Sequence, residues 1–238
     1  IMSLAPVIEF HASLPSTMDE ARILANTDAN EFTVVQAGEQ TAGRGRFGNQ
    51  WSSPTGNLYM TIILRPDMPT RLCAQISFAL ALALSDTLKG TGAKLKWPND
   101  VLIEGKKVAG ILLELEASEK ETPDYMLVGM GVNIISGPEG SAVVTDYLPT
   151  TVDDFRDALL ENLAGWYERW LNEPFAVIRS AWLERAQGIG MPVTVRMNDR
   201  KLDGHFDGLD QDGNLVLRHD DGSTRIISSG DVHFRPVP

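Results

Sequence analysis

Apolar residues along the first part of the chain occur in short runs that predict β-strands. Four runs, at residues 32–38, 57–64, 94–97 and 125–134, are rich in β-branched or apolar side chains. The last run is apolar almost throughout, as expected for a central strand covered on both faces. A further run, residues 101–116, splits at Glu104-Gly105-Lys106, which is typical of a β-hairpin turn.

Between these runs, the apolar residues recur with helical spacing. Thr17 and Glu20 have the spacing of a capping box, so a helix is expected to begin there and to contain MDEARILAN. Three more helices are predicted: Thr70 to Lys89, residues 151–172, and a last one after the break at Pro174.

After Gly188 the pattern changes to short β runs separated by Asp, Gly and Asn turns. Seven apolar residues could fill a small barrel or sandwich: Val193, Val195, Leu215, Val216, Leu217, Ile226 and Ile227. The chain is therefore expected to be α+β. Residues 1–187 would form a mixed-sheet domain with flanking helices, and residues 188–238 a small all-β domain.

Composition narrows the classes of function. The 238 residues carry a formal net charge of −11, which disfavours general binding to nucleic acid. No N-terminal secretory signal is recognisable, and the most apolar run, ISFALALAL, is too short to span a bilayer. A cytoplasmic protein without a membrane partner is expected. The single cysteine, Cys73, lies in an apolar run and is interpreted as a buried side chain rather than a nucleophile.

Residues 41–51, TAGRGRFGNQW, place two arginines among three glycines. Guanidinium groups pair well with phosphate or carboxylate oxygens. The glycines make the loop costly to order, so an anion that orders it could also exclude water. A solvated turn is the alternative, and the loop alone does not decide between the two interpretations.

The segment KWPND, residues 96–100, ends the third predicted strand with several polar side chains. Pro98 stiffens the chain and would fix where Asn99 and Asp100 point. On the return strand of the hairpin, Lys106 and Lys107 must face opposite sides, so one of them is expected to point inward.

The segment GMGVNI, residues 129–134, predicts a strand with little side-chain bulk on one face. Two glycines would allow a flat ligand, or a packed helix, to approach the backbone, and Asn133 offers both a donor and an acceptor. Trp51 would either cover a purine or fill the core. The four histidines show no spacing typical of metal ligands.

GRGRFGNQW, KWPND, KKVAGILLE and GVN, in this order, resemble the biotin protein ligases, and the resemblance covers nearly the whole chain from Ser16 onward. It implies a catalytic domain of the class II synthetase type followed by an SH3-like barrel. It also implies a two-step reaction in which biotin and MgATP give biotinyl-5′-AMP, after which a lysine of a biotin carboxyl carrier protein takes the biotinyl group.

The resemblance also implies roles for individual residues. Arg46 and Lys107 match the catalytic residues that hold the biotin carboxylate and the adenylate phosphate. Matches to biotin contacts are Ser16, Thr17, Gln40, Arg44, Gly45, Arg46, Lys107 and Gly110. Matches to ATP or adenylate contacts are Arg44, Arg46, Trp51, Lys96, Asn99 and Asn133, with Asp100 on the phosphate and metal side. The metal ligands are not assigned.

Two features separate this chain from parts of the family. The family commonly has Ser-Thr-Asn at the biotin contact, whereas the third residue here is Met18, which cannot replace the hydrogen bonds of an amide. About fifteen residues precede the first predicted helix, which is too few for a helix-turn-helix module, so a ligase without DNA binding is expected.

Two alternative functions share some of these features. A lipoate or octanoate ligase shares the fold, but its site must accept a long aliphatic chain, for which a hydrogen-bonding Ser-Thr-Gln set would be misplaced. A non-catalytic binding module would use the arginine-glycine loop only to contact an acidic partner.

Overall fold

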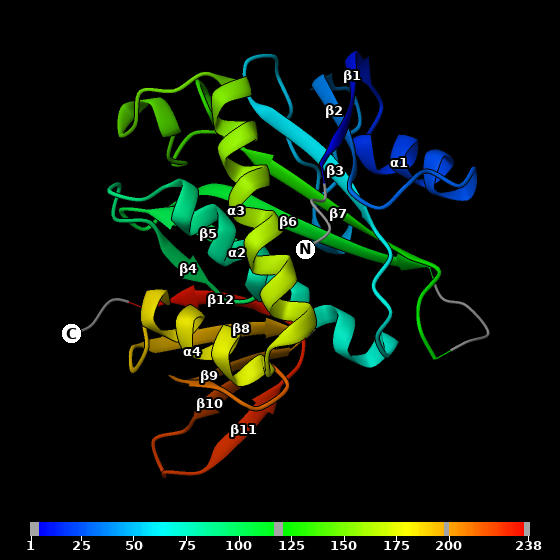
Figure 1. The fold of residues 1–238 in the computed structure, drawn as a ribbon. Helices are drawn as coiled ribbons and strands as arrows, with labels where there is room; N and C mark the ends of the chain where they lie inside the picture. Colours follow the sequence, from blue (N-terminus) through cyan, green and yellow to red (C-terminus); the bar gives the residue numbers. More distant parts are fainter. Residues whose placement is uncertain (1–4, 117–120, 198–199, 236–238) are drawn as a thin grey trace.

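The computed structural model describes residues 5–116, 121–197 and 200–235, which form two β-sheets and the helices packed on them (Figure 1). The larger sheet has seven strands. Their spatial order is β1 (Val7–Leu14), β2 (Thr33–Gln40), β3 (Leu58–Leu64), β7 (Tyr125–Val132), β6 (Lys106–Glu116), β5 (Asp100–Ile103) and β4 (Lys94–Lys96). β1 and β2 are parallel, whereas the other neighbours are antiparallel, so the sheet is mixed.

Helices cover both faces of this sheet. The α-helices are α1 (Thr17–Asn26), α2 (Ile76–Thr87), α3 (Val152–Asn172) and α4 (Phe175–Arg185). Three short 3₁₀ helices are Arg46–Gly48, Thr70–Gln75 and Val144–Asp146. α1 packs on one face, against Val35, Ile63 and Leu127. Their neighbours Val34, Ile62 and Val128 point to the opposite face, into the main core with α2 and α3. Burial on both faces explains why the central strands are apolar almost throughout.

The smaller sheet contains only C-terminal strands and is antiparallel. In spatial order these are β11 (Thr224–Ile227), β10 (Leu215–Arg218), β9 (Arg200–Leu209), β8 (Pro192–Met197) and β12 (Asp231–Phe234). Its buried side chains join the main core, and the Trp97 indole N–H donates to the carbonyl of Gly213 at 3.1 Å. The predicted architecture, a mixed sheet with flanking helices followed by a small all-β part, is confirmed.

Some predicted details were wrong. Val216 is only half-buried and Ile226 is 52% exposed, because alternate residues of β10 and β11 point away from the core. Thr70–Gln75 is a 3₁₀ helix, so the α-helix begins only at Ile76. β1 was not predicted. It is an edge strand with a mixed sequence and mostly exposed side chains, and only its pairing with β2 defines it.

The predicted capping box at the start of α1 does not form. Ser16 is the N-cap residue, and its hydroxyl accepts the N–H of Met18. The Thr17 N–H donates to the Gln40 side chain at 2.9 Å instead of to Glu20. Within the described parts of the chain, no helix is long and apolar enough to cross a membrane.

Candidate active site

A pocket of about 430 Å³ opens on the face of the large sheet that α1 covers. Its wall contains all but one of the residues to which the sequence assigned a binding or catalytic role: Ser16, Thr17, Gln40, Arg44, Gly45, Arg46, Trp51, Asn99, Lys107, Gly110 and Asn133. Lys96 is outside the wall, but its Nζ lies 3.6 Å from Asp231 and 3.9 Å from Asp100, which both line the pocket. The structure thus brings the predicted residues together.

One end of the pocket, at the start of α1, consists of buried hydrogen-bonding groups. Ser16 and Thr17 are 1% and 3% exposed, which is unusual for hydroxyl side chains. The Thr17 hydroxyl lies 3.2 Å from Gln40 Oε1 and 2.8 Å from the hydroxyl of Thr61 on β3. Buried polar groups that keep a free face toward a cavity are suited to bind a small polar ligand.

Glycines on β6 and β7 form the floor of the pocket. A Cβ at Gly129 would lie 2.9 Å from the Met18 sulfur, and one at Gly131 would lie 2.5 Å from the Trp51 indole. The glycines therefore accommodate protein side chains: Gly129 packs against α1, the alternative noted from the sequence, and Gly131 against the indole. Met18 is buried and lines the pocket, so an apolar thioether stands where the family commonly has an amide.

The middle of the pocket holds charged side chains of both signs. The Lys107 ammonium lies 2.6 Å from Asp100 and 5.0 Å from the centre of the Trp51 ring. Lys106 is exposed, so the prediction that the two lysines face opposite sides is confirmed. Asp100 is on β5 and Lys107 on β6, so the ion pair links the two adjacent strands of the hairpin.

The arginine-glycine loop lies along the pocket and contributes both of its arginines. Arg44 contacts Asp19 of α1 at 2.8 Å. Arg46 donates to Asn99 Oδ1 at 3.2 Å and to the carbonyl of Gly230 at 3.4 Å. Burial lowers the pKa of the Arg46 guanidinium, while the carboxylates of Asp100 and Asp231 oppose this shift. A half-buried guanidinium that is incompletely paired attracts an anion strongly.

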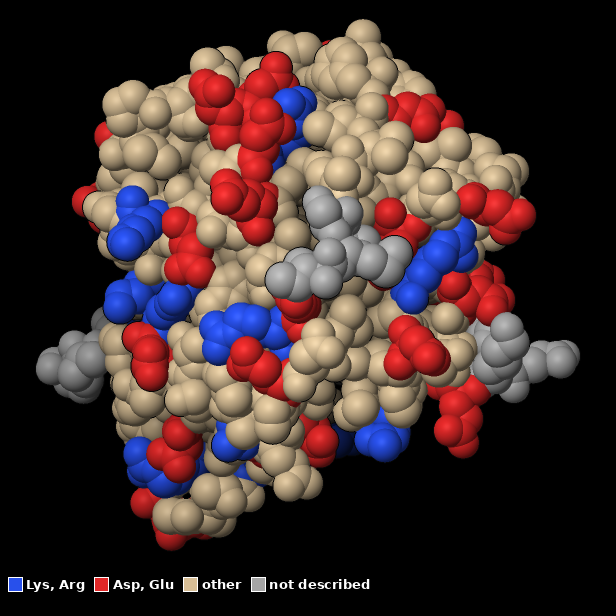
Figure 2. Space-filling view, viewed as in Figure 1, with Lys and Arg blue, Asp and Glu red and all other residues tan. Residues whose placement is uncertain are grey.

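The outer surface of the protein carries charges of both signs. Figure 2 shows many Asp and Glu side chains on the face viewed, with Lys and Arg interspersed among them. A local group of Arg44, Arg46, Lys96 and Lys107 in a chain of net charge −11 would favour a small anion at this position.

Two parts of the pocket wall were missed from the sequence. Asp231 comes from the start of β12 in the C-terminal sheet, and residues 138–141 close another side. No motif marks Asp231, because its proximity to Lys96 depends on how the small sheet packs. Asn133 lies where predicted, but its amide donates to the carbonyls of Ala142 and Lys107 at 3.2 and 3.4 Å.

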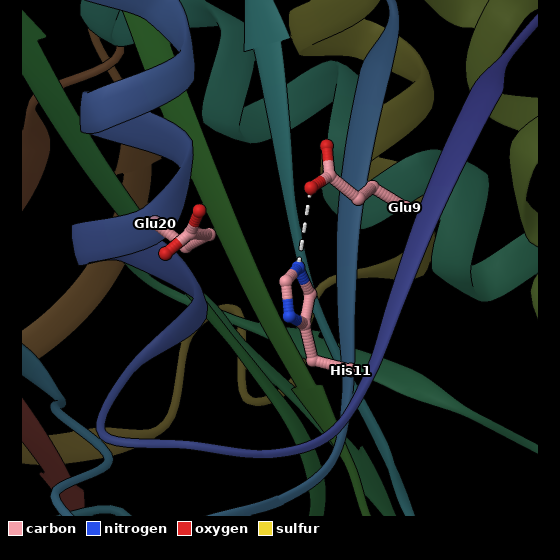
Figure 3. A group of neighbouring side chains, drawn as sticks. All are labelled: Glu9, His11 and Glu20. Atoms are coloured by element: carbon pink, nitrogen blue, oxygen red, sulfur yellow. Dashed lines mark ion pairs between the residues drawn. The ribbon is translucent and has the colours of Figure 1, made fainter.

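A separate group of Glu9, His11 and Glu20 lies between β1 and α1 (Figure 3). Their ligand-type atoms lie within 4.8 Å of one another, a proximity that the sequence spacing did not reveal. His11 is 3.4 Å from Glu9, so the two can form an ion pair, and none of the three lines the pocket. Cys73 is also remote from the wall, and burial raises the pKa of its thiol, as expected for a structural cysteine.

Comparison with known proteins identifies the family. The profile of the Biotin/lipoate A/B protein ligase family matches residues 9–133, more than half of the chain, and that of the Biotin protein ligase C terminal domain matches residues 188–235. The chain belongs to the biotin protein ligase family. It is 40% identical to the biotin–[acetyl-CoA-carboxylase] ligase of Paracoccus denitrificans, an alignment that covers 94% of this chain and 98% of that protein.

Other biotin protein ligases support the same assignment. The bifunctional ligase/repressor BirA of Bacillus subtilis is 32% identical over 92% of this chain and 72% of its own length. The structure of the Aquifex aeolicus biotin protein ligase in complex with biotin and ATP has a TM-score of 0.82 at 25% identity, covering 97% of this chain and 99% of that one. The resemblance noted from the sequence motifs is thereby confirmed.

Proposed function

We propose that this biotin protein ligase activates biotin with MgATP and transfers it to a lysine of a biotin carboxyl carrier protein domain. One observation carries the proposal: a single pocket joins a neutral hydrogen-bonding end to an end that presents Arg44, Arg46 and Lys107. Biotin has the matching distribution, with a polar, uncharged ring at one end and a carboxylate at the other.

The hydrogen-bonding end fits a cyclic urea. The Ser16 oxygen accepts the Met18 N–H, and the described residues offer its proton no acceptor, so it can donate to a ligand carbonyl. The Thr17 proton goes to Gln40 or Thr61, so a Thr17 lone pair can accept from a ligand N–H. A urea needs this combination of donor and acceptor, whereas the dithiolane and aliphatic chain of lipoate offer nothing to bond. The lipoate alternative is accordingly not favoured.

The end that presents Arg44, Arg46 and Lys107 fits the first chemical step. The biotin carboxylate attacks the α-phosphorus of ATP, a P–O bond to pyrophosphate breaks, and biotinyl-5′-AMP forms. Two anions must approach each other, so fixed cations are needed. Lys107 and Arg46 would hold the carboxylate and phosphate oxygens, and Arg44 would hold the loop over them. Lys96 and Asn99 would act from the phosphate side, and Gly45 and Gly110 would allow close approach.

The second step transfers the biotinyl group. A neutral lysine amine of the carrier attacks the acyl carbon, the C–O bond to AMP breaks, and an amide forms with loss of a proton. The loop would shield the anhydride from water until the carrier arrives. The carboxylase-ligase name of the Paracoccus relative supports a carrier domain of acetyl-CoA carboxylase as partner. ATP and such carriers are cytoplasmic, and we propose the same location for this chain.

The acidic residues around the pocket suit Mg²⁺. Mg²⁺ in nucleotide sites is commonly bound by one or two carboxylates together with phosphate oxygens. Asp100 and Asp231 offer two carboxylates on the wall, held near each other by Lys96. They would hold the ion, which would neutralise phosphate charge. Residues 188–238 would then form a distinct small domain that supplies part of the adenylation site.

Trp51 would pack on the adenine, and Asn133 would contact it through the oxygen of its amide. The indole is held against Gly131, so we expect Gly131→Ala to displace it and to weaken ATP binding about tenfold, the effect of losing one stacking contact. Titration calorimetry with ATP measures this. Gly165→Ala, in α3 with open space around the added carbon, is the control and should leave ATP binding unchanged.

Titration calorimetry also separates the candidate functions. A biotin protein ligase binds biotin, binds it more tightly with ATP, and does not respond to lipoate. A mass spectrum of a carrier domain incubated with the protein, biotin and MgATP should show addition of one biotinyl group. A lipoate ligase would respond to lipoate in the titration, and a binding module would leave the carrier unmodified. Binding to nucleic acid is not expected, given the charge of −11.

A further inference from the structure

A chain of four hydrogen-bonded side chains runs beneath the polar end of the pocket. It joins Thr61, Thr17, Gln40 and Ser53, and ends on the backbone carbonyl of Trp51. The exposed fractions of Thr61, Thr17 and Ser53 are 0%, 3% and 7%. If one of these hydroxyls loses its hydrogen-bond partner, water cannot readily take the partner's place. The function proposed above uses Thr17 and Gln40, whereas Ser53 has no role in it so far.

The direction of each hydrogen bond follows from the Trp51 end of this hydrogen-bonded row of side chains. A backbone carbonyl can only accept, so the Ser53 hydroxyl must donate its proton to Trp51 O, at 3.0 Å. With that proton committed, Ser53 can only accept from Gln40, also at 3.0 Å. The Gln40 amide must therefore turn its nitrogen toward Ser53.

The Thr17 end of the row requires the same orientation of the Gln40 amide. The Thr17 backbone N–H can only donate, and it lies 2.9 Å from the Gln40 side-chain oxygen. The Gln40 oxygen accordingly faces Thr17, and the nitrogen faces Ser53. The orientation of the Gln40 amide is thus determined by two backbone groups. The Trp51 carbonyl can only accept, and the Thr17 N–H can only donate.

This orientation determines what the pocket presents to a ligand. Ser53 takes one proton of the Gln40 amide, and no other acceptor among the described residues takes the second, so this N–H is free to donate to a ligand in the pocket that Gln40 lines. Because Gln40 accepts from Thr17, Thr17 keeps a lone pair for a ligand N–H. Without Ser53, the amino group of Gln40 would lose its acceptor, and only the contacts of its oxygen with Thr17 would hold the amide.

On the basis of the proposed function, we propose that Ser53 is a positioning residue for biotin. It does not touch the ligand but holds the Gln40 amide so that the ring end of the pocket offers donors to the urea oxygen. It also ties that end to the base of the arginine-glycine loop, because the Trp51 N–H bonds the carbonyl of Gly43 at 2.9 Å.

The test is Ser53→Ala, titrated with biotin, with ATP, and with the cyclic guanidine analogue in which nitrogen replaces the urea oxygen. We expect the Kd for biotin to rise about fivefold, in the range of one neutral hydrogen bond. The Kd for ATP and the rate of adenylation at saturating biotin should stay within about twofold. The preference for biotin over the guanidine analogue should fall. In the wild-type protein the Gln40 N–H faces the urea oxygen of biotin but would face an N–H of the analogue, and without Ser53 that N–H is no longer held in place.

Thr87→Val is the matched control. The Thr87 hydroxyl also donates to a carbonyl, that of Ala83, and accepts from an amide, that of Asn162, but it lies between α2 and α3. This variant should lose comparable stability and bind biotin as wild type does. Ser53→Cys, whose thiol is somewhat larger and forms only weak hydrogen bonds, replaces the alanine variant should that one not fold.

An unchanged Kd for biotin in the Ser53 variant overturns the proposal. So does an equal loss for biotin and its guanidine analogue, since that result indicates general damage to the pocket. Failure of the proposed function would differ from both outcomes, because the wild-type protein itself would then not bind biotin.

Discussion

Lys107→Ala should reduce the rate of biotinyl-5′-AMP formation by about two to three orders of magnitude, the effect of removing one preorganised stabilising group. Lys107 is the ammonium group placed directly on the pocket wall, and its partner Asp100 would be left without its closest cation. The loss should appear in kcat as well as in KM, because charge accumulates when the carboxylate meets the α-phosphate. Pyrophosphate release is the measurement.

Lys106→Ala is the matched control for this variant. Lys106 precedes Lys107 on the same strand, carries the same charge, and points to solvent. It should release pyrophosphate at the wild-type rate, and both variants should melt within a few degrees of the wild-type protein. Wild-type kinetics in Lys107→Ala would remove this residue from the chemistry.

Local sequence signals predicted most of the fold and of the pocket wall. The hairpin turn is one example, because Glu104 and Gly105 both adopt positive φ there, as a tight turn requires. Most of the site motifs lie in loops or at strand ends, whereas KKVAGILLE lies inside β6. Arg46, Asn99 and Lys107 are far apart in the chain, yet they meet in one pocket.

What the sequence did not predict depends on long-range packing. The strand β1 forms only because β2 offers it a free edge. Asp231 reaches Lys96 only after the small sheet docks on the large one. The capping box failed for a related reason: a distant glutamine, Gln40, took the N–H that local spacing assigned to Glu20. Local rules apply to α1 only where no tertiary contact competes with them.

Arg46→Ala should lower the rate of pyrophosphate release by about two orders of magnitude and should also let the intermediate escape. Three segments meet at this guanidinium: the loop itself, Asn99 of the KWPND segment, and the carbonyl of Gly230, which precedes β12. Loss of the side chain removes a cation and also releases the loop from both neighbours. Biotinyl-5′-AMP in the filtrate after rapid ultrafiltration measures the escape.

Arg46→Lys separates these two effects. Lysine keeps the positive charge, but its side chain is shorter and lacks the planar guanidinium, whose Nη1 here donates to both Asn99 and Gly230. We expect it to recover much of the rate of pyrophosphate release while still releasing the intermediate, because closure needs both contacts and the chemistry needs chiefly charge. Arg225→Ala, on the exposed edge strand β11, is the control and should change neither quantity. Equal recovery of rate and retention by lysine would show that charge alone holds the loop over the intermediate.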